Sequence, residues 1–180
     1  MLKKVSSLIL STLLATSLSA GEYFTDFYVG WRGVQQNFSA NTNLTTLQTG
    51  IGLGGRFWVA MSDEILIGGE AGFSHIETHW DISGNITHLQ FALKIKPAQQ
   101  IDIFGGIGIG LRGAPEMNNT SPVLAGTMGD LGVAFIFGEE NWRVEAVGYY
   151  FNFSGNVNNL REEVTSWGAG VHLGKTFLLY

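Results

Sequence analysis

Four histidines are the residues of this chain best suited to metal binding or proton transfer: His75, His79, His88 and His172. The first three gather in a polar stretch that also contains Glu77 and Asp81. Imidazole and carboxylate groups together bind zinc and carry out acid–base chemistry. The stretch has no helical pattern that would bring these groups onto one face. We therefore expect polar loop residues there, with no bound metal and no cofactor.

A hydroxyl nucleophile needs a base and an orienting acid in contact with it. Ser74 and His75 are neighbours, but in an extended strand successive side chains point to opposite faces. His172 has no serine beside it on its own face, and the chain contains no cysteine. The sequence therefore predicts no catalytic residue and excludes disulfides and thiol chemistry.

Two glycine-rich runs, 50–55 and 105–110, resemble nucleotide-binding loops in composition only. A phosphate-binding loop requires a helix directly after the glycines, and both runs lie inside strand patterns that no helix follows. We expect these glycines to make room for large inward rings such as Tyr28, Phe104 and Tyr149, or to permit tight curvature of a sheet.

The elements that carry these residues are strands with two unlike faces. In 167–180, Trp167, Val171 and Leu173 alternate with Gly170 and His172, which is the period of a strand. Seven earlier segments show the same alternation: about 23–36, 47–60, 65–74, 88–96, 101–112, 130–137 and 142–150. Short polar turns at 62–64, 97–100 and 138–141 alternate with longer polar stretches at 37–46, 76–85, 113–121 and 152–163. This spacing predicts eight antiparallel strands.

Acidic and basic residues recur on the glycine-rich face of the strands, which we predict to be the inside. They are Asp26, Arg56, Glu70, Lys94, Asp102, Arg143 and Glu145. Because a buried charge is costly unless it is paired, these groups should be neighbours. Counting back from the turns predicts the pairs Arg56 with Glu70 and Lys94 with Asp102, joined by Arg143 and Glu145 into a plug.

Aromatic residues lie near the strand ends on the opposite, apolar face. We predict one belt beside the long loops and another beside the short turns, as expected where rings meet a membrane interface. The first contains Trp31, Phe73, Tyr150 and Trp167, and the second contains Phe57, Phe135, Phe137, Trp142 and Phe177.

Residues 1–20 have the features of a cleaved secretory signal peptide. Lys3 and Lys4 precede an apolar run that ends in small residues, and the run is too short and broken for a spanning helix. Removing these two of the ten basic residues leaves eight against 15 acidic residues in 21–180. An acidic chain argues against a nucleic-acid partner. Without a helical span, 21–180 can cross a bilayer only as a closed barrel.

The end of the chain resembles the assembly signal of bacterial outer-membrane barrels. His172, Gly174, Phe177, Leu179 and Tyr180 fill its positions, whereas Lys175 departs from the usual apolar residue. The whole of 21–180 resembles the group of small barrels that includes the OmpA transmembrane domain and OmpX-type proteins. The resemblance implies an all-β, eight-stranded, antiparallel up-and-down transmembrane β-barrel, integral to the outer membrane of a Gram-negative bacterium. Its implied partners are outer-membrane lipid, lipopolysaccharide and the barrel-assembly machinery.

The resemblance implies a structural or surface-interaction role through extracellular loops, with a lumen plugged by the ion-pair network. The extracellular partner is unknown from these residues. Two alternatives stay open: an outer-membrane enzyme that modifies lipid A, as some small barrels do, and a narrow channel for ions or small solutes.

Overall fold

The computed structural model describes residues 22–38, 45–78, 83–113, 123–157 and 160–179, and these consist of strands and short turns. Within them no helix is long and apolar enough to cross a membrane. The strands are β1 (Tyr23–Phe38), β2 (Thr45–Ala60), β3 (Ile65–Thr78), β4 (Ser83–Ala98), β5 (Ile101–Gly113), β6 (Val123–Phe137), β7 (Trp142–Val157) and β8 (Leu160–Leu178).

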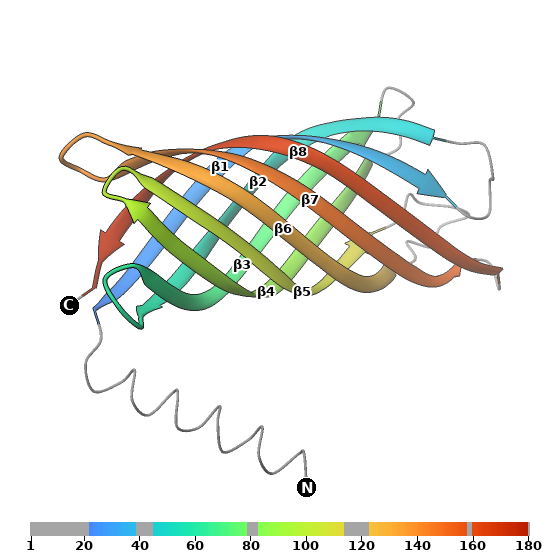
Figure 1. Ribbon diagram of the computed structural model, residues 1–180. Coiled ribbons are helices and arrows are strands. Elements are labelled where there is room, and N and C mark those ends of the chain that lie inside the picture. The colour runs from blue at the N-terminus through green and yellow to red at the C-terminus, as the bar shows by residue number, and fades with distance from the viewer. Residues whose placement is uncertain (1–21, 39–44, 79–82, 114–122, 158–159, 180) are drawn as a thin grey trace, which may run out of the picture.

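The eight strands form a closed antiparallel barrel in which each strand pairs with its neighbour in sequence (Figure 1). The β1–β8 ladder closes the ring, with Phe24 opposite Leu178 and Phe38 opposite Val164. Closure satisfies the backbone groups that an open sheet would leave unpaired at its edges. The predicted all-β, up-and-down barrel of eight strands is therefore confirmed.

The two ends of the barrel differ. The connections 61–64, 99–100 and 138–141 lie at the end where β1 begins and β8 finishes, which we name the turn end (Figure 1). Gly138 and Asn141 adopt positive φ angles of 72° and 56° there, so the β6–β7 turn uses the two residue types that tolerate this conformation best. The opposite end is named the loop end.

Two of the predicted long loops are wrong in length. β3 and β4 continue to Thr78 and from Ser83, and β7 and β8 continue to Val157 and from Leu160. The ladders persist here, with His75 opposite Asn85 and Asn156 opposite Arg161. Backbone pairing does not depend on apolar side chains, so polar residues extend these strands beyond the apolar segments on which the prediction rested.

The predicted alternation of faces is confirmed by side-chain exposure. Ile107 is 74% exposed and Leu131 is 67% exposed on the outside, whereas Phe104 and Arg56 are 2% and 1% exposed on the inside. The outer surface of the described strands therefore carries many large apolar side chains. An apolar surface of this extent is typical of a site that contacts a membrane or another protein.

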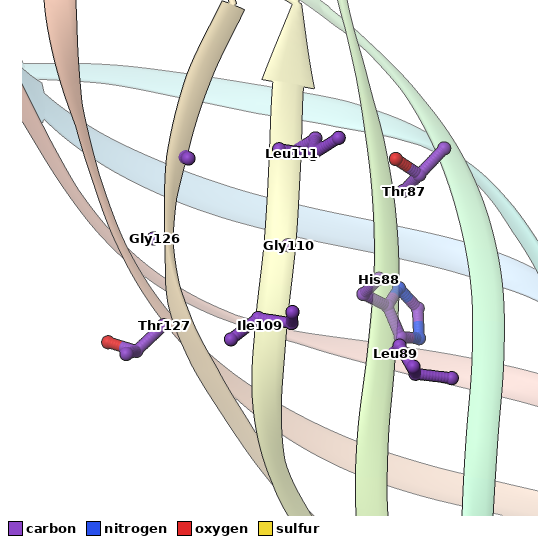
Figure 2. A pocket seen from close by; sticks show the side chains of 9 residues that line it. Thr87, His88, Leu89, Ile109, Gly110, Leu111, Gly126 and Thr127 are labelled. Atoms are coloured by element: carbon purple, nitrogen blue, oxygen red, sulfur yellow. The ribbon is translucent and has the colours of Figure 1, made fainter.

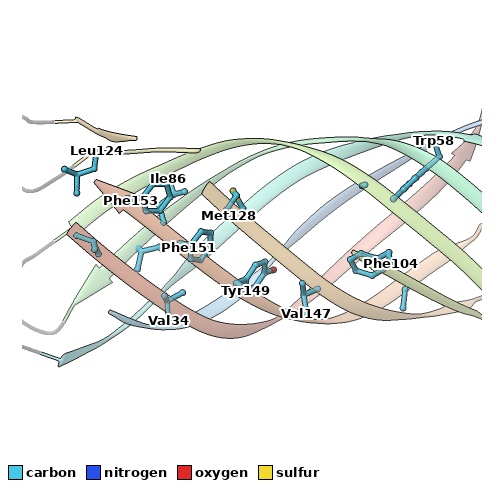
Figure 3. Close-up of a cluster of buried hydrophobic side chains, with 14 of the residues drawn as sticks. Val34, Trp58, Ile86, Phe104, Leu124, Met128, Val147, Tyr149, Phe151 and Phe153 are labelled. Atoms are coloured by element: carbon cyan, nitrogen blue, oxygen red, sulfur yellow. The ribbon is translucent and has the colours of Figure 1, made fainter. Parts of the chain in front are cut away.

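The interior has two layers, of which the sequence indicated one. The luminal charges gather toward the turn end, and a buried apolar cluster runs along the lumen from Trp58 and Phe104 to Leu124 (Figure 3). We name its loop-end members the apolar plug: Val34, Ile76, Ile86, Leu124, Phe151, Phe153 and Val164. The buried side chains of Gln36, Gln48 and Arg112 lie at the same end. The prediction missed the apolar plug because it treated 152–163 as a loop and did not follow the inward parity beyond Tyr149.

Inward glycines provide room for large rings. A Cβ at Gly54 would collide with the hydroxyl and ring of Tyr28, and one at Gly132 would collide with the ring of Phe104. Other inward glycines, such as Gly50, Gly68 and Gly126, have a carbonyl oxygen of the neighbouring strand where a Cβ would lie, so both expected uses of inward glycine are supported. Alternation of glycine with large rings lets a narrow barrel fill its own lumen.

We expect Gly54→Ala to lower the free energy of unfolding by about 1–3 kcal/mol, because the added methyl displaces a packed ring. Gly55→Ala is the matched control. Its Cβ points outward, 3.4 Å from the Phe27 ring, and the change should stay within about 0.5 kcal/mol. Urea unfolding from lipid vesicles, followed by tryptophan fluorescence, measures both. Equal effects of the two substitutions would contradict the ring-packing role of Gly54.

Candidate functional site

Arg56 on β2 lies at the centre of the luminal charges. Its Nε donates to Oε2 of Glu70 on β3 at 2.5 Å, and its Nη1 donates to Oε1 of Glu145 on β7 at 2.8 Å. The guanidinium also lies over the rings of Tyr28 and Phe104, 4.4 and 4.3 Å from their centroids. One cation thus bridges two buried carboxylates across the barrel, while its flat faces contact aromatic rings.

Asp26 on β1 forms a second centre nearer the turn end. Its Oδ2 accepts hydrogen bonds from Lys94 Nζ at 2.7 Å, Arg143 Nη1 at 2.6 Å and Trp58 Nε1 at 2.7 Å. Its Oδ1 accepts a further bond from the hydroxyl of Thr176 at 2.6 Å. The carboxylate is fully buried, so these four donors replace the water that it has lost.

Arg143 joins the two centres, because its Nε lies 2.7 Å from Oε1 of Glu145. Asp102 completes the group at longer range, with Oδ2 at 3.5 Å from both Lys94 Nζ and Arg143 Nη1. The structure therefore brings all seven predicted interior residues together. We call this set the luminal ion-pair network; it comprises Asp26, Arg56, Glu70, Lys94, Asp102, Arg143 and Glu145.

The two ion pairs predicted across hairpin turns differ in register and in distance. Arg56 lies directly opposite Glu70 in the β2–β3 register, as predicted by counting back from the turn between these strands. Lys94 instead lies opposite Phe104, two residues from Asp102, because pairing continues to Ala98 and Ile101 and leaves a turn of 99–100, shorter than the predicted 97–100; the ladder also shifts between Ile95 and Ala98. Pro97 within this irregularity has no N–H to donate to a ladder. Lys94 consequently reaches across the lumen to Asp26 and approaches Asp102 only at 3.5 Å.

Two histidines belong to the lumen. His88 was grouped with the loop histidines, but its Nε2 lies 3.1 Å from Oε1 of Glu70, which also accepts the Tyr28 hydroxyl at 2.5 Å. His172 places Nδ1 3.1 Å from Oε2 of Glu145 and Nε2 2.5 Å from the hydroxyl of Tyr149. The inward parity of each histidine was readable in the sequence, but their partners on other strands were not.

His75 has separate surroundings on the outer face. Its Nδ1 contacts Oδ1 of Asn85 at 2.7 Å and its Nε2 contacts Oε1 of Glu77 at 3.0 Å. His79 and Asp81 fall outside the described residues. Within the described ranges, no group of three or more His, Cys, Asp or Glu side chains is arranged to hold a metal ion.

Glu145, His172 and Tyr149 form a chain of acid, imidazole and hydroxyl. In an open cleft this order of groups activates a nucleophile. Here the three residues are 0%, 1% and 5% exposed, and Tyr28 stacks on the imidazole at 4.5 Å between ring centroids. These buried contacts join β7 to β8.

Arg32 is a further luminal cation outside the network. Its Nη1 donates to the hydroxyl of Ser74 at 2.5 Å, and its guanidinium lies 4.4 Å from the centroid of the Tyr149 ring. Its aliphatic part passes over Gly170, where a Cβ would meet Cγ at 3.3 Å. Arg32 therefore lies between the luminal ion-pair network and the apolar plug.

The nine aromatic residues predicted for two belts all lie on the outer surface. Trp31, Tyr150 and Trp167 are 54%, 51% and 56% exposed, but Trp31 and Tyr150 lie near the middle of β1 and β7, because these strands continue to Phe38 and Val157. The others are Phe57, Phe73, Phe135, Phe137, Trp142 and Phe177, each at least 37% exposed. Phe73 belongs to the loop-end group, and the remaining five lie near the turns or the end of β8.

The residues of the C-terminal signal divide between the faces of β8. His172 and Gly174 are buried inside, Phe177 and Leu179 are exposed, and Tyr180 lies outside the described residues. Leu179 N donates to Tyr23 O at 2.7 Å, which extends the closing ladder.

Lys175, the residue that departs from the signal, projects outward beside aromatic rings. Its Nζ donates to Oε2 of Glu140 at 2.6 Å and lies 5.2 Å from the Trp142 ring centroid. The hydrogen bond and the positive charge of Lys175 hold the pKa of Glu140 below its ordinary value.

We expect Arg56→Met to lower the free energy of unfolding by about 3–5 kcal/mol, because two buried carboxylates lose their shared cation. The triple variant Arg56→Met, Glu70→Gln, Glu145→Gln should recover most of this loss. Lys175→Met, which removes a partly exposed pair, should change stability by no more than about 1 kcal/mol. Urea unfolding from vesicles compares the three, and failure of the triple variant to recover stability would argue against charge pairing as the cause.

Comparisons with known proteins agree with this architecture. No protein-family model matches the sequence, and neither does any curated protein. Neisserial surface protein A superposes with a TM-score of 0.61 at 10% identity, over 86% of this chain and 97% of that one. Ail, the attachment invasion locus protein of Yersinia pestis, superposes with a TM-score of 0.52 at 14% identity, over 87% and 99%. The expected likeness is thus confirmed at the level of fold: the chain has the architecture of the small eight-stranded outer-membrane barrels.

Proposed function

We propose that this chain is an integral protein of a Gram-negative outer membrane, exported by residues 1–20, and that its barrel presents surface-interaction loops on a sealed scaffold. The observation that supports the proposal is a lumen lined by buried side chains: the luminal ion-pair network toward the turn end, and the apolar plug with Gln36, Gln48 and Arg112 toward the loop end. We infer that these side chains leave no passage, so that the protein acts through its surfaces.

The outer face supports membrane embedding. Large apolar side chains such as Leu53, Phe91 and Ile107 are 55%, 58% and 74% exposed with no covering segment in the described structure. In water this surface would drive aggregation, whereas hydrocarbon solvates it. The two aromatic groups near the strand ends would then meet the headgroups. Short turns would face the periplasm and the loop end would face outward, as in known outer-membrane barrels.

A narrow channel is the less favoured role. Phe151 and Phe153 stack at 5.8 Å between ring centroids inside the loop-end half, and both are fully buried. Toward the turn end, Arg56 forms ion pairs with carboxylates of β3 and β7. An ion would have to displace the apolar side chains and then separate the paired charges. Both steps oppose conduction through this barrel.

An enzyme acting on lipid A is also less favoured. Such chemistry needs an activated hydroxyl that an acyl or sugar group can reach. The one acid–imidazole–hydroxyl chain described above ends at Tyr149, which points into the lumen and is 5% exposed. Lipid on the outside has no route to it.

The loop end is the surface best placed for a partner. Loops on a rigid scaffold commonly carry binding, because the scaffold fixes their bases without restricting their sequence. One structure with this fold belongs to an attachment invasion locus protein, and that description concerns that protein alone. For this chain it motivates a test of attachment. Lipopolysaccharide and outer-membrane lipid would surround the barrel, and the barrel-assembly machinery would engage β8.

We expect the purified protein to give no discrete conductance steps in planar bilayers. Phe151→Ala with Phe153→Ala should also be silent, because the luminal ion-pair network still closes the lumen. Single-channel recording tests both. Discrete steps in the wild type that disappear on changing Glu70 or Arg56 would contradict the sealed scaffold and favour the channel.

We expect expression of the protein in a non-adherent bacterial host to increase attachment to epithelial cells or matrix proteins. Replacing 39–44 and 114–122 with Gly-Ser sequences of equal length should abolish the increase. Replacing the turn residues 62–63 in the same way is the control and should preserve it. Counting bound bacteria measures the effect, provided that surface levels match. Attachment that survives both loop replacements would refute the interaction role.

A further inference from the structure

Asp130 on β6 is a luminal acid that lies outside the luminal ion-pair network. It alternates with Met128 and Gly132 on the inward side of the strand. Its Oδ2 is buried and makes no hydrogen bond to any residue that the structure describes. The luminal ion pairs of the described strands do not include it. An ionised carboxylate in this position would have lost water without gaining a cation, which is costly.

The groups beside Asp130 on β4, β5 and β7 bring no permanent charge. Gly106 lies directly opposite on β5, and Tyr149 lies directly opposite on β7. Gln90 on β4 approaches the carboxyl group; its Oε1 lies where a Cβ of Gly106 would be, and it has no hydrogen-bond partner within the described ranges. His88, the preceding inward residue of β4, directs Nε2 to a carboxylate of β3. These neighbours can share hydrogen bonds with Asp130 but cannot offset a fixed negative charge.

The charged groups that face Asp130 come from β1, β2 and β3. Glu70 and Arg56 both interact with it electrostatically. Glu70 carries the same charge and repels an ionised Asp130. Arg56 already donates hydrogen bonds to Glu70 and to Glu145. Arg32 on β1 donates to a hydroxyl of β3 and packs on an aromatic ring. The cations near Asp130 are therefore bound to other groups.

The buried charges of the lumen balance without Asp130. The four buried acids equal four of the buried bases in number, and the fifth base, Arg112, interacts with Glu162. The balanced residues are Asp26, Glu70, Asp102, Glu145, Arg32, Arg56, Lys94 and Arg143. An ionised Asp130 would add one negative charge that no base of this set offsets.

We infer that Asp130 is a proton-binding site of the lumen and remains a neutral carboxylic acid in the folded barrel at neutral pH. The proton removes the excess charge, and the O–H group that it forms gives the unpartnered Oε1 of Gln90 a donor. Burial and a neighbouring carboxylate both favour the neutral form of an acid. A water molecule could satisfy the same hydrogen bonds but would leave the charge in place. The inference concerns the lumen and does not rest on the proposed role of the loops.

Infrared spectroscopy of the protein in lipid vesicles tests the inference. At neutral pH ordinary carboxyl groups are ionised, so the carbonyl band of a protonated acid is separate from their bands. We expect the wild type to show this band and Asp130→Asn to lack it. Asp63→Asn makes the same change at an exposed residue of the β2–β3 turn. This matched control should retain the band.

The pH dependence of stability is a second measurement. The unfolded chain releases the Asp130 proton above about pH 4, whereas the folded barrel keeps it. The folded state then binds more protons, so the free energy of unfolding falls as the pH rises. Between about pH 5 and about pH 7, the unfolding equilibrium constant of the wild type should increase relative to that of Asp130→Asn by about tenfold per pH unit. Urea unfolding from vesicles measures both, and the comparison cancels the contributions of His88 and His172.

Three outcomes would overturn the inference. The first is a wild type without the band, as expected if Asp130 is ionised and balanced by a protonated His88. The others are a band that survives Asp130→Asn and an equal pH dependence of the two proteins. The wild-type spectrum alone decides the first outcome, so the test does not depend on the folding of a variant. Attachment and conductance assays are independent of Asp130, and a negative result here would leave the proposed function standing.

Discussion

Charge neutralisation inside a closed ring is the constraint on which the rest of this structure depends. A filled lumen has no water to compensate an unpaired charge. Arg56 meets this requirement by bridging Glu70 and Glu145, and Arg143 and Lys94 meet it around Asp26. The pairs Arg56–Glu145, Lys94–Asp26 and Arg143–Asp26 join strands that are far apart in sequence. The contacts that balance charge therefore also hold distant strands of the barrel together.

Apolar side chains also fill the lumen, because the charged side chains do not occupy its whole length. Large rings and glycines alternate toward the turn end, and the apolar plug occupies the loop end. Buried apolar side chains beside the charges lower the local dielectric and strengthen their pairing. The two groups of side chains thus support each other physically.

The outer surface is not uniform. The apolar face is interrupted by a groove over β4, β5 and β6 (Figure 2), where Ile109 and Leu111 stand beside Ala125 and Thr127. Toward the loop end the outward side chains become polar while the ladders continue, as at His75 opposite Asn85. The paired sheet therefore extends beyond the apolar zone.

The sequence by itself determined the strand number, the two faces and the inward parity of the charged residues, because period-two alternation and turn residues are local properties. It also placed Arg56 opposite Glu70, since one short turn sets that register. It further predicted the ion pair of Lys94 with Asp102, which is present at 3.5 Å, but not the position of Lys94 opposite Phe104, because residues counted as turn are paired in the ladder. The contacts of His172 with Glu145 and Tyr149, of Lys94 with Asp26, and the apolar plug were decided only by tertiary structure. The closure of the ring and the stagger of the strands determine which inward side chains meet across the lumen, and neither can be predicted from the sequence of a single strand.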